Sequence, residues 1–357
     1  MKRMLILAGD GIGPEVCAQA LRVLDVLIER HGLAVEVLAG DIGGACYDQC
    51  GVPVTEETLV LAVRVEAVLV GAVGGPKWQE VPRDRRPEAG LLALRHAMQV
   101  YANLRPGYAF DALVGASTLR PEIVRGVDLI FVRELMGGVY FGQPRGIERI
   151  APDVERGFDN QVYTTPEIER IARVAFSLAR ARQGRVISVD KANVMESGAL
   201  WRRVVTRLGA EEFPDIALGH MYADNCAMQL VRDPRQFDVI LTDNLFGDLL
   251  SDVAAMATGS LGMLPSACLS DPGHAGLFEP IHGSAPDIAG RNVANPIATI
   301  LSLAMALRWS LDRPDLASAV TAAVASALAD GARTRDLGGE MTTEEMGAAI
   351  VRSLHAA

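Results

Sequence analysis

The sequence of 357 residues predicts an α/β protein with a largely parallel sheet. Short apolar runs of β-forming residues alternate with longer stretches whose apolar residues recur at helical spacing. Strands that alternate with helices in this way are typical of parallel sheets covered by helices. The sequence shows no internal repeat and no low-complexity linker, and its length suits two domains or one large α/β unit.

The first strand is expected at 4–9 and the helix that follows it at 14–32. The next strand and helix are expected at 65–75 and 88–104. Three later apolar runs predict further strands, at 127–135, 185–190 and 237–244.

Residues 137–165 differ from the rest, because they are rich in β-forming and turn residues and carry few long apolar runs. This composition predicts a hairpin arm that reaches away from the core, a common way to clasp a partner subunit.

Composition excludes several classes of protein. The net charge is −10 and there is no basic tail, so nucleic-acid binding is not expected. The apolar run near the N-terminus stops at Gly9, too short for a signal peptide, and no window approaches the length of a membrane span. The cysteines favour reduced thiols in a cytoplasmic protein, because they are odd in number and form no CxxC pair: Cys17, Cys46, Cys50, Cys226 and Cys268.

The motif GDGIGPE, residues 9–15, follows a strand and opens a helix, as a dinucleotide-binding loop does. Pro14 occupies the position of the third glycine in that fingerprint. A tight turn with proline near the helix start is the interpretation that we favour over a phosphate cradle.

Arginines at the ends of predicted elements suggest a polyanionic substrate. Glu88, Leu91, Leu92 and Arg95 fall on one face of a helix. That face either lets Arg95 reach solvent along its apolar stem or forms a pocket wall in which a guanidinium binds a carboxylate. Arg105 follows the helix predicted at 88–104, and Arg133 lies at the end of a predicted strand, where α/β proteins place ligands.

Asp248 and Asp252, in NLFGDLLSD, lie four residues apart and would share one helix face. Together with Asp224 they would offer the oxygen ligands that Mg²⁺ or Mn²⁺ prefers. The alternative is that Asp248 is a first-turn carboxylate stabilised by the helix dipole.

Only three lysines occur, Lys2, Lys77 and Lys191, either through codon bias or because an amine is needed at some of them. Lys191 follows a strand, and a lysine in a water-poor site can lose its proton and act as a base. Tyr140 is either a possible acid or an aromatic residue of a strand. Residues 279–296 predict a structured functional loop, in which Asp287 would bind ribose hydroxyls and repel a 2′-phosphate.

Eight motifs resemble those of the 3-isopropylmalate dehydrogenases, a branch of the metal- and NAD-dependent β-decarboxylating dehydrogenases. The resemblance runs nearly end to end and weakens after about residue 310, and GGPKW and PEAGLLALR favour this branch over its isocitrate and tartrate relatives. In chain order the motifs are GDGIGPE, GGPKW, PEAGLLALR, YANLRP, RELMGGVYFG, DKANV, NLFGDLLSD and EPIHGSAPDIAG.

The resemblance implies the isocitrate/isopropylmalate dehydrogenase-like fold, with two α/β domains and the active site in the cleft between them. Residues 1–100 and 259–357 would form a discontinuous cofactor-binding domain. Residues 101–258 would form the domain for dimerisation, substrate and metal, with a β-arm near 140–164. The protein would be a homodimer with shared active sites.

The resemblance also implies the site residues. Catalysis would fall to Lys191, Tyr140 and Asp224, of which Lys191 and Asp224 would reach the site from the other subunit. The metal would bind to Asp224, Asp248 and Asp252. The substrate would bind to Glu88, Leu91, Leu92, Arg95, Arg105, Arg133, Val194 and Asp224. The NAD would bind to Gly75, Pro76, Lys77, Glu88, Glu279, His282, Gly283, Ser284, Ala285, Asp287 and Asn295.

The implied activity is oxidative decarboxylation of (2R,3S)-3-isopropylmalate to 4-methyl-2-oxopentanoate, CO₂ and NADH, in leucine biosynthesis. Gly198, Met195 and the thiols of Cys46 and Cys50 depart from the family pattern. They leave open a related enzyme that acts on tartrate, malate or another 3-substituted malate. Outside this class, the aspartates would also suit a metal-dependent phosphatase, and the loop a nucleotide-binding protein without activity.

Overall fold

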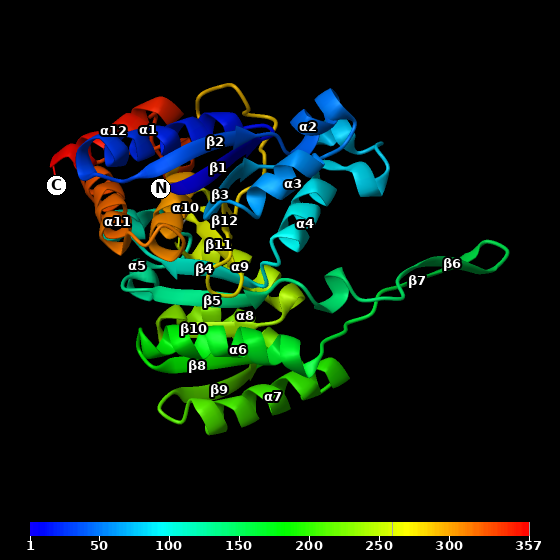
Figure 1. Cartoon of the computed structure of the whole chain (residues 1–357). Coiled ribbons are helices and arrows are strands. Elements are labelled where there is room, and N and C mark those ends of the chain that lie inside the picture. Colours follow the sequence, from blue (N-terminus) through cyan, green and yellow to red (C-terminus); the bar gives the residue numbers. More distant parts are fainter. Residues whose placement is uncertain (259, 357) are drawn as a thin grey trace. The chain divides into compact units, whose positions relative to one another are not determined.

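The computed structural model describes residues 1–258 and 260–356 and divides the chain into two compact units. Unit 1 comprises Met1–Val100, Ala109–Pro121 and Thr258–Ala357. Unit 2 comprises Tyr101–Tyr108 and Glu122–Ala257. Each unit has its own strands and helices. They are labelled in Figure 1, where the colours run along the sequence from blue at the N-terminus to red at the C-terminus.

The strands of unit 1 lie in the order β2-β1-β3-β12-β11. Parallel pairing joins β2 to β1, β1 to β3 and β3 to β12, while β11 runs antiparallel to β12. Every residue of β3 is buried, as expected for a strand covered on both faces. The bounds are β1 Lys2–Gly9, β2 Val35–Gly40, β3 Ala67–Ala72, β11 Pro265–Leu269 and β12 Gly276–Pro280.

The helices of unit 1 form an inner and an outer layer. α1 and α10 pack against the strands, α11 and α12 pack on these helices, and α2 and α3 pack against α4. Their bounds are α1 Gly13–His31, α2 Gly43–Cys50, α3 Glu56–Ala62, α4 Pro87–Ala97, α10 Ile297–Trp309, α11 Pro314–Ala329 and α12 Thr343–Ala356. Short 3₁₀ helices are η1 Pro76–Trp78, η2 Arg83–Arg85, η3 Asp111–Ala116, η6 Leu261–Met263 and η7 Arg335–Leu337.

The strands of unit 2 lie in the order β4-β5-β10-β8-β9. β4 runs antiparallel to β5, and the other neighbours are parallel. α6 packs against β5, β8 and β10. The bounds are β4 Ala102–Tyr108, β5 Asp128–Glu134, β8 Arg185–Asp190, β9 Ala217–Tyr222, β10 Val239–Thr242, α6 Thr165–Arg180, α7 Glu196–Glu212, α8 Ala223–Arg232 and α9 Asn244–Thr258, with short α5 Pro121–Val124, η4 Gly138–Tyr140 and η5 Pro234–Gln236.

A two-stranded hairpin, β6 (Gly146–Ala151) and β7 (Val154–Phe158), extends from unit 2 (Figure 1). Ile147, with 76% of its surface exposed, Ile150 and Val154 present apolar side chains to solvent. An isolated hairpin of this kind is only marginally stable in water. The segment that the sequence analysis singled out therefore does contain a hairpin with an uncovered apolar surface.

The α/β class with mostly parallel strands is confirmed, but one predicted element was wrong. The helix expected at 88–104 ends at Ala97, and residues 102–108 form β4 instead. Gln99 adopts a φ of 52°, a left-handed conformation that stops the helix. The apolar residues after it continued the helical spacing by chance, so periodicity alone did not reveal the break.

The GDGIGPE motif forms a tight turn between β1 and α1. The Asp10 carboxylate accepts hydrogen bonds of 2.8 Å from the backbone N–H groups of Gly44, Ala45 and Gly74. The Ile12 N–H donates to the Ser284 carbonyl at 2.8 Å. A Cβ on Gly11, which has a φ of +57°, would lie 2.0 Å from that carbonyl oxygen. The glycine is needed for close approach to the 281–296 loop.

We predict that Gly11→Ala destabilises the protein more than Gly32→Ala. Gly32 has a similar φ of +64°, but a Cβ there would meet no atom of the described residues within 4 Å. Gly32→Ala should lower the free energy of unfolding by about 1–2 kcal/mol through backbone strain alone. Gly11→Ala should cost about 1–3 kcal/mol more, because the backbone around Ser284 must move. Urea denaturation of both variants tests this, and equal losses would show that the close contact is not a constraint.

Candidate active site

α9 presents the two aspartates of NLFGDLLSD on one face. The helix follows Asp243, whose carboxylate accepts a hydrogen bond of 2.8 Å from the Phe246 N–H, as an N-cap side chain does. Asp248 and Asp252 lie one turn apart from there, with 32% and 57% of their side-chain surface exposed. The i, i+4 spacing that the sequence predicted is therefore realised on a helix.

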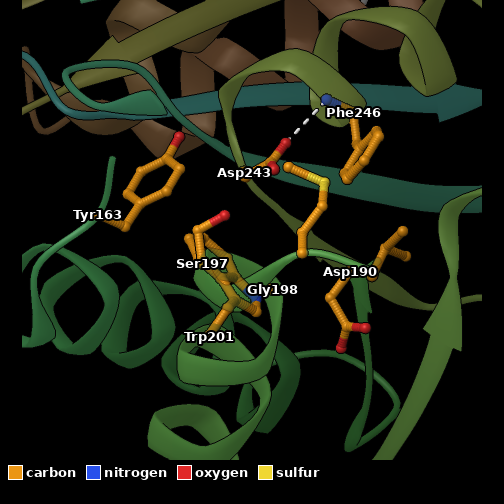
Figure 2. Close-up of a pocket in the computed structure, with 9 residues that line it drawn as sticks. Tyr163, Asp190, Ser197, Gly198, Trp201, Asp243 and Phe246 are labelled. Atoms are coloured by element: carbon orange, nitrogen blue, oxygen red, sulfur yellow. Dashed lines mark hydrogen bonds between the residues drawn. The ribbon is translucent and has the colours of Figure 1, made fainter. Parts of the chain in front are cut away.

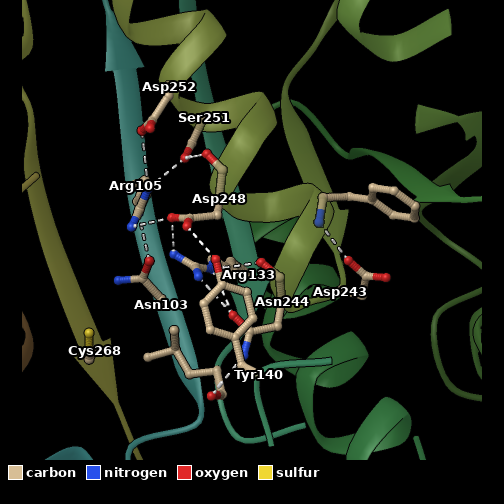
Figure 3. A network of polar contacts seen from close by, with 12 residues as sticks. Asn103, Arg105, Arg133, Tyr140, Asp243, Asn244, Asp248, Ser251, Asp252 and Cys268 are labelled. Carbon is tan, nitrogen blue, oxygen red and sulfur yellow. Dashed lines mark hydrogen bonds and ion pairs between the residues drawn. The ribbon is translucent and has the colours of Figure 1, made fainter. Parts of the chain in front are cut away.

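Asp248 is the centre of a network of polar contacts in unit 2 (Figure 3). Its Oδ1 lies 2.5 Å from Nη1 of Arg133 and 3.2 Å from Nη2 of Arg105. The Tyr140 hydroxyl donates to its Oδ2 at 2.8 Å. The structure therefore brings together Arg105, Arg133, Tyr140, Asp248 and Asp252 from the predicted site.

The pairing of β4 with β5 places both arginines beside α9. Asn103 of β4 lies opposite Arg133 of β5, and Arg105 follows Asn103 by two residues on the same face. The Nε of Arg105 donates to Asn103 Oδ1 at 2.8 Å, and its Nη1 donates to Ser251 Oγ at 2.8 Å. Nη1 also lies 3.5 Å from Asp252. Four side chains thus fix one guanidinium, if the contact with Asp248 is included.

The local charges alter the pKa values of two groups. Burial raises the pKa of Tyr140, and the hydrogen bond to the Asp248 carboxylate raises it further. Burial also raises the pKa of Asp252, with Arg105 opposing this effect and Asp248 adding to it. Tyr140 therefore keeps its proton at neutral pH, and Asp252 is the carboxylate whose negative charge is less completely compensated.

The donor set on α9 suits a hard divalent cation, because it offers carboxylate oxygens on a partly exposed face. Within residues 1–258 and 260–356, however, no three His, Cys, Asp or Glu side chains lie close enough together to hold a metal ion. The two aspartates can supply part of a site, and its remaining ligands must come from water, substrate or another chain.

Asp224, the third predicted metal ligand, is paired elsewhere in unit 2. Its Oδ1 lies 2.8 Å from Nζ of Lys191, and this hydrogen bond lowers the pKa of Asp224. The Lys191 Nζ also lies 5.8 Å from the centre of the Tyr222 ring. Val194, three residues further on, is 71% exposed. The structure therefore groups these predicted residues into a second, exposed cluster.

The α4 face in unit 1 carries an arginine that is held by an internal ion pair. Nη2 of Arg95 donates to Glu279 Oε1 at 2.6 Å, and 20% of its side chain is exposed. The guanidinium therefore combines an internal partner with limited access to solvent. Leu91 is half-buried, while Leu92 is 41% exposed and Glu88 is exposed. The face offers one ion pair and a partly open apolar patch.

The 281–296 loop rests on the start of α1. The Glu15 carboxylate accepts hydrogen bonds from the N–H groups of Gly290 and Asn292, at 3.3 and 3.1 Å. Ala285 and Asn292 adopt positive φ values of 39° and 55°. Asp287 and Gly283 are exposed, whereas Ser284 is buried. Residues 281–296 thus form an ordered irregular segment, whereas residues 279 and 280 of the predicted loop belong to β12.

His282 and Asn295, two predicted NAD-binding residues of this loop, differ in their hydrogen bonding. Burial lowers the pKa of His282, whose Nε2 has no hydrogen-bond partner in the described part of the chain. Asn295, in contrast, is used within the fold, because its Nδ2 donates to Asp336 at 2.9 Å and its Oδ1 accepts from the Ile297 N–H at 3.0 Å. His282 thus keeps one ring nitrogen without a partner among the described residues, while Asn295 would have to exchange a partner to bind a ligand.

The 75–88 segment lies at the surface of unit 1. Nζ of Lys77 pairs with Asp48 at 2.5 Å, and the Trp78 indole N–H donates to the same carboxylate at 3.1 Å. Pro76 is exposed, and Gly75 precedes it with φ and ψ both near 160°. The segment is anchored to α2 by Asp48, a residue that the sequence analysis did not single out.

Comparison with known proteins decides the family. The family model described as isocitrate/isopropylmalate dehydrogenase matches residues 3–350. The chain belongs to the isocitrate/isopropylmalate dehydrogenase family. The resemblance inferred from the eight motifs is therefore confirmed, and so is the expected fold class of this family.

Alignments with individual family members extend over almost the whole chain. This chain is 62% identical to a 3-isopropylmalate dehydrogenase of Caulobacter vibrioides, over 99% of its own length and 100% of that of the relative. It is 54% identical to that of Gluconobacter oxydans, over 99% and 98%. Among solved structures, an isocitrate dehydrogenase of Methylococcus capsulatus superposes with a TM-score of 0.87 at 34% identity, over 99% of both chains. A β-decarboxylating dehydrogenase of Thermococcus kodakarensis gives 0.82 at 36%, over 100% of this chain and 97% of the other.

No helix in the described residues is long and apolar enough to cross a membrane.

Sequence reasoning missed several polar residues that hold the site in place. They are Glu15 beneath the loop, Asn103 beside Arg105, Asn244 beside Arg133 and Asp336 beside Asn295. Glu15, Asn103 and Asn244 stand in motifs that were quoted, so their position in the motif was a signal that could have been used. No motif pointed to Asp336, because its partner Asn295 lies far away in the sequence.

A small cavity with room for about one water molecule lies beneath the N-terminus of α9 (Figure 2). Asp243, Tyr163, Asp190 and Trp201 are among its lining residues. Burial raises the pKa of Asp243 to about 7, Glu134 and Asp190 add to this, and the Phe246 N–H and Arg133 oppose it.

We predict that Asp243→Asn removes a pH dependence of stability. Because its folded pKa is raised, the Asp243 contribution is most favourable below its unfolded pKa and is lost as pH rises towards 7. Wild-type stability should therefore fall relative to the Asn variant by roughly 1.4 kcal/mol per pH unit between pH 5 and 7. Urea denaturation of both proteins at these two pH values measures the change. A difference that does not vary with pH would contradict the buried, titrating carboxyl.

Proposed function

We propose that this chain catalyses the NAD- and divalent-metal-dependent oxidative decarboxylation of (2R,3S)-3-isopropylmalate. The products are 4-methyl-2-oxopentanoate, CO₂ and NADH, and the reaction is a step of leucine biosynthesis. The observation that carries the proposal is the cluster of two buried arginines, a tyrosine hydroxyl and two aspartates around Asp248. Such a cluster can hold a polycarboxylate beside a cation. Relatives with 62% and 54% identity over nearly the full length are 3-isopropylmalate dehydrogenases, which supports the specific substrate.

The arginines would bind the two carboxylates of the substrate. Arg105 and Arg133 are 11% and 5% exposed, so their charges are only weakly screened by water. Each now shares its charge with Asp248. Arg95 pairs with Glu279 and would exchange that partner for a substrate carboxylate. A planar guanidinium suits such exchanges, because its five donors can serve two acceptors at once.

Asp248 and Asp252 would bind Mg²⁺ or Mn²⁺, together with Asp224 of a second copy of the chain. When bound, the cation lowers the pKa of the substrate's C2 hydroxyl and stabilises the negative charge that develops as CO₂ leaves. Asp252 is the more exposed of the two carboxylates, at 57% against 32%, and has the weaker internal partner. It can therefore turn to a cation at a lower cost than Asp248.

Lys191 would accept the proton of the C2 hydroxyl. Its ammonium group pairs with Asp224 at 2.8 Å. A cation held by Asp224 would compete for this contact, so the residue that would bind the metal also positions the base.

Tyr140 would protonate C3 after decarboxylation. Its pKa is raised by burial and by Asp248, so the phenol is protonated at neutral pH, as a proton donor must be. Its hydroxyl is hydrogen-bonded to Asp248 Oδ2, which orients the group within the arginine and aspartate network. A ring that is 39% exposed leaves the hydroxyl within reach of a substrate.

NAD would bind at the 281–296 loop and the 75–88 segment and accept the hydride from C2. The exposed carboxylate of Asp287 would receive the adenosine ribose. Arg291 donates from Nη1 to the Asp287 carbonyl at 3.4 Å, which brings a positive charge near this position. His282, with its unpartnered Nε2, offers a further polar group to the cofactor.

The protein would act as a homodimer, with unit 1 in cofactor binding and unit 2 in dimerisation. The β6–β7 hairpin supports this, because its exposed apolar residues need a partner surface. Lys191 and Asp224 are close together and exposed enough to serve a site in a second copy.

The substrate preference tests the proposal. NADH absorbance should rise with 3-isopropylmalate, NAD⁺ and Mg²⁺, and should stop in excess EDTA. Burial of three carbons on the α4 face contributes roughly 2.4 kcal/mol, or on the order of sixty-fold in kcat/KM over malate. Leu91→Ala should shrink this preference about fivefold to tenfold, because it removes part of the apolar patch.

Leu61→Ala is the matched control, because Leu61 is also half-buried, on α3, and is not assigned to the site. It should leave the preference unchanged. Malate, tartrate and isocitrate complete the panel. A wild type that uses one of them as well as 3-isopropylmalate would identify a related decarboxylating dehydrogenase instead.

We predict that Lys191→Met abolishes oxidation of the hydroxy acid and leaves the fold intact. The side chain keeps a similar size and loses only its amine, which removes the base that accepts the C2 proton. The loss in kcat should be at least about a hundredfold. Lys2→Met, at an ion pair with Asp312 on the surface, is the control. Comparable turnover of the two variants would exclude Lys191 as the base.

A further inference from the structure

Asn244 is the first residue of α9 and is 1% exposed. Its side chain uses its full hydrogen-bonding capacity. Nδ2 donates to the carbonyl groups of Leu135 and Gly137, at 3.0 and 3.1 Å. Oδ1 accepts from Nη2 and Nε of Arg133, at 2.8 and 3.1 Å. One amide thus joins the start of α9 to the end of β5 and to a predicted substrate-binding arginine.

The orientation of this amide follows from its neighbours. The side facing Leu135 and Gly137 meets two carbonyl oxygens, so it must be the donor Nδ2. The side facing Arg133 meets only donors, so it must be the acceptor Oδ1. Reversing the amide would place like groups against each other on both sides. Asparagine is therefore held in one orientation, and so is the guanidinium that it contacts.

The contacts with Asn244 leave Arg133 one principal direction in which to act. Nε also donates to the Asn244 carbonyl at 2.9 Å. Nε and Nη2 are thus occupied by Asn244, and Nη1 points to Asp248 at 2.5 Å, as Figure 3 shows. The guanidinium is planar, so fixing one edge fixes the other.

We propose that Asn244 is a positioning residue for substrate binding, which acts by holding the guanidinium of Arg133 towards the carboxylate of a 2-hydroxy acid. This inference rests on the proposed function, because it assigns Arg133 to the substrate. Asn244 touches neither the substrate nor the reacting atoms. Its effect passes entirely through Arg133.

The start of α9 does not itself require this side chain. Asp243 supplies the N-terminal cap through its hydrogen bond from the Phe246 N–H. The Asn244 backbone N–H donates to the Tyr163 hydroxyl at 2.9 Å, a contact that any residue except proline can make. Removing the side chain therefore leaves the helix capped, takes the donor from the Leu135 and Gly137 carbonyls, and leaves Arg133 only the Asn244 backbone carbonyl on this side.

The experiment is a double-mutant cycle with Asn244→Ala and Arg133→Met, measured as KM, kcat and the calorimetric Kd of 3-isopropylmalate. Asn244→Ala should raise KM and Kd for the substrate about tenfold, the loss expected for one hydrogen-bonded charged group. kcat should fall less than about threefold and KM for NAD⁺ should not change, because the interaction serves ground-state binding. In the Arg133→Met background, Asn244→Ala should change KM less than about twofold.

Tyr163→Phe is the matched control. It removes the hydroxyl that accepts from the Asn244 backbone, within the same buried network, and leaves Arg133 untouched. It should lower thermal stability without raising KM. If Asn244→Ala does not yield folded protein, Asn244→Ser takes its place in the same cycle, since its hydroxyl can still serve one of the carbonyls.

The two proposals fail in different ways. A wild type that oxidises no 3-substituted malate overturns the proposed function and this inference with it. An active wild type with an unchanged KM in Asn244→Ala overturns the inference alone. An effect of Asn244→Ala that persists in full without Arg133 also overturns it, because it would show a structural role independent of that arginine.

Discussion

The negative charge of Asp248 is the constraint on which the site in unit 2 depends. Two carboxylates one turn apart on α9 repel each other, and Arg133, Arg105 and the Tyr140 hydroxyl offset this repulsion. These partners come from β5, β4 and the residues after β5, so the charge fixes how the helix sits on the strands of its own unit. Under the proposed function, a substrate carboxylate would compete with Asp248 for the arginines, and a cation would compete with the arginines for Asp248. Binding of either ligand would therefore favour binding of the other.

The sequence allowed prediction of the chemistry of this site more readily than of its supports. The spacing of Asp248 and Asp252 is a property of one helix, so it could be inferred locally. The neighbours of Arg105 could not, because they depend on the antiparallel register of β4 and β5. The helix predicted at 88–104 covers the start of β4, and on a helix Asn103 and Arg105 would not share a face. The helix ends before β4 because Gln99 has a positive φ, and the spacing of apolar residues does not reveal this conformation.

The long-range contacts of the GDGIGPE turn also could not be predicted from its sequence. The turn itself was predicted correctly, because Pro14 replaces the third glycine of the dinucleotide fingerprint. The reason for its glycine became clear only from Ser284, whose carbonyl occupies the space of a Gly11 side chain. Glu15 likewise finds its partners at Gly290 and Asn292, more than 270 residues away along the chain. Contacts between residues so far apart in the sequence depend on the packing of α1 against the 281–296 loop. They cannot be predicted from one motif alone.

Three charged groups assigned to ligand binding, one in each of the two clusters and one on α4, already have an internal counter-ion. Asp248 is paired with the arginines, Asp224 with Lys191, and Arg95 with Glu279. Breaking one such pair leaves a partly buried charge without a partner, which is costly. Under the proposed function, a dianionic acid and a divalent cation that bind together would exchange several of these pairs at once. The internal pairing would then favour concerted binding over binding of an anion without a cation.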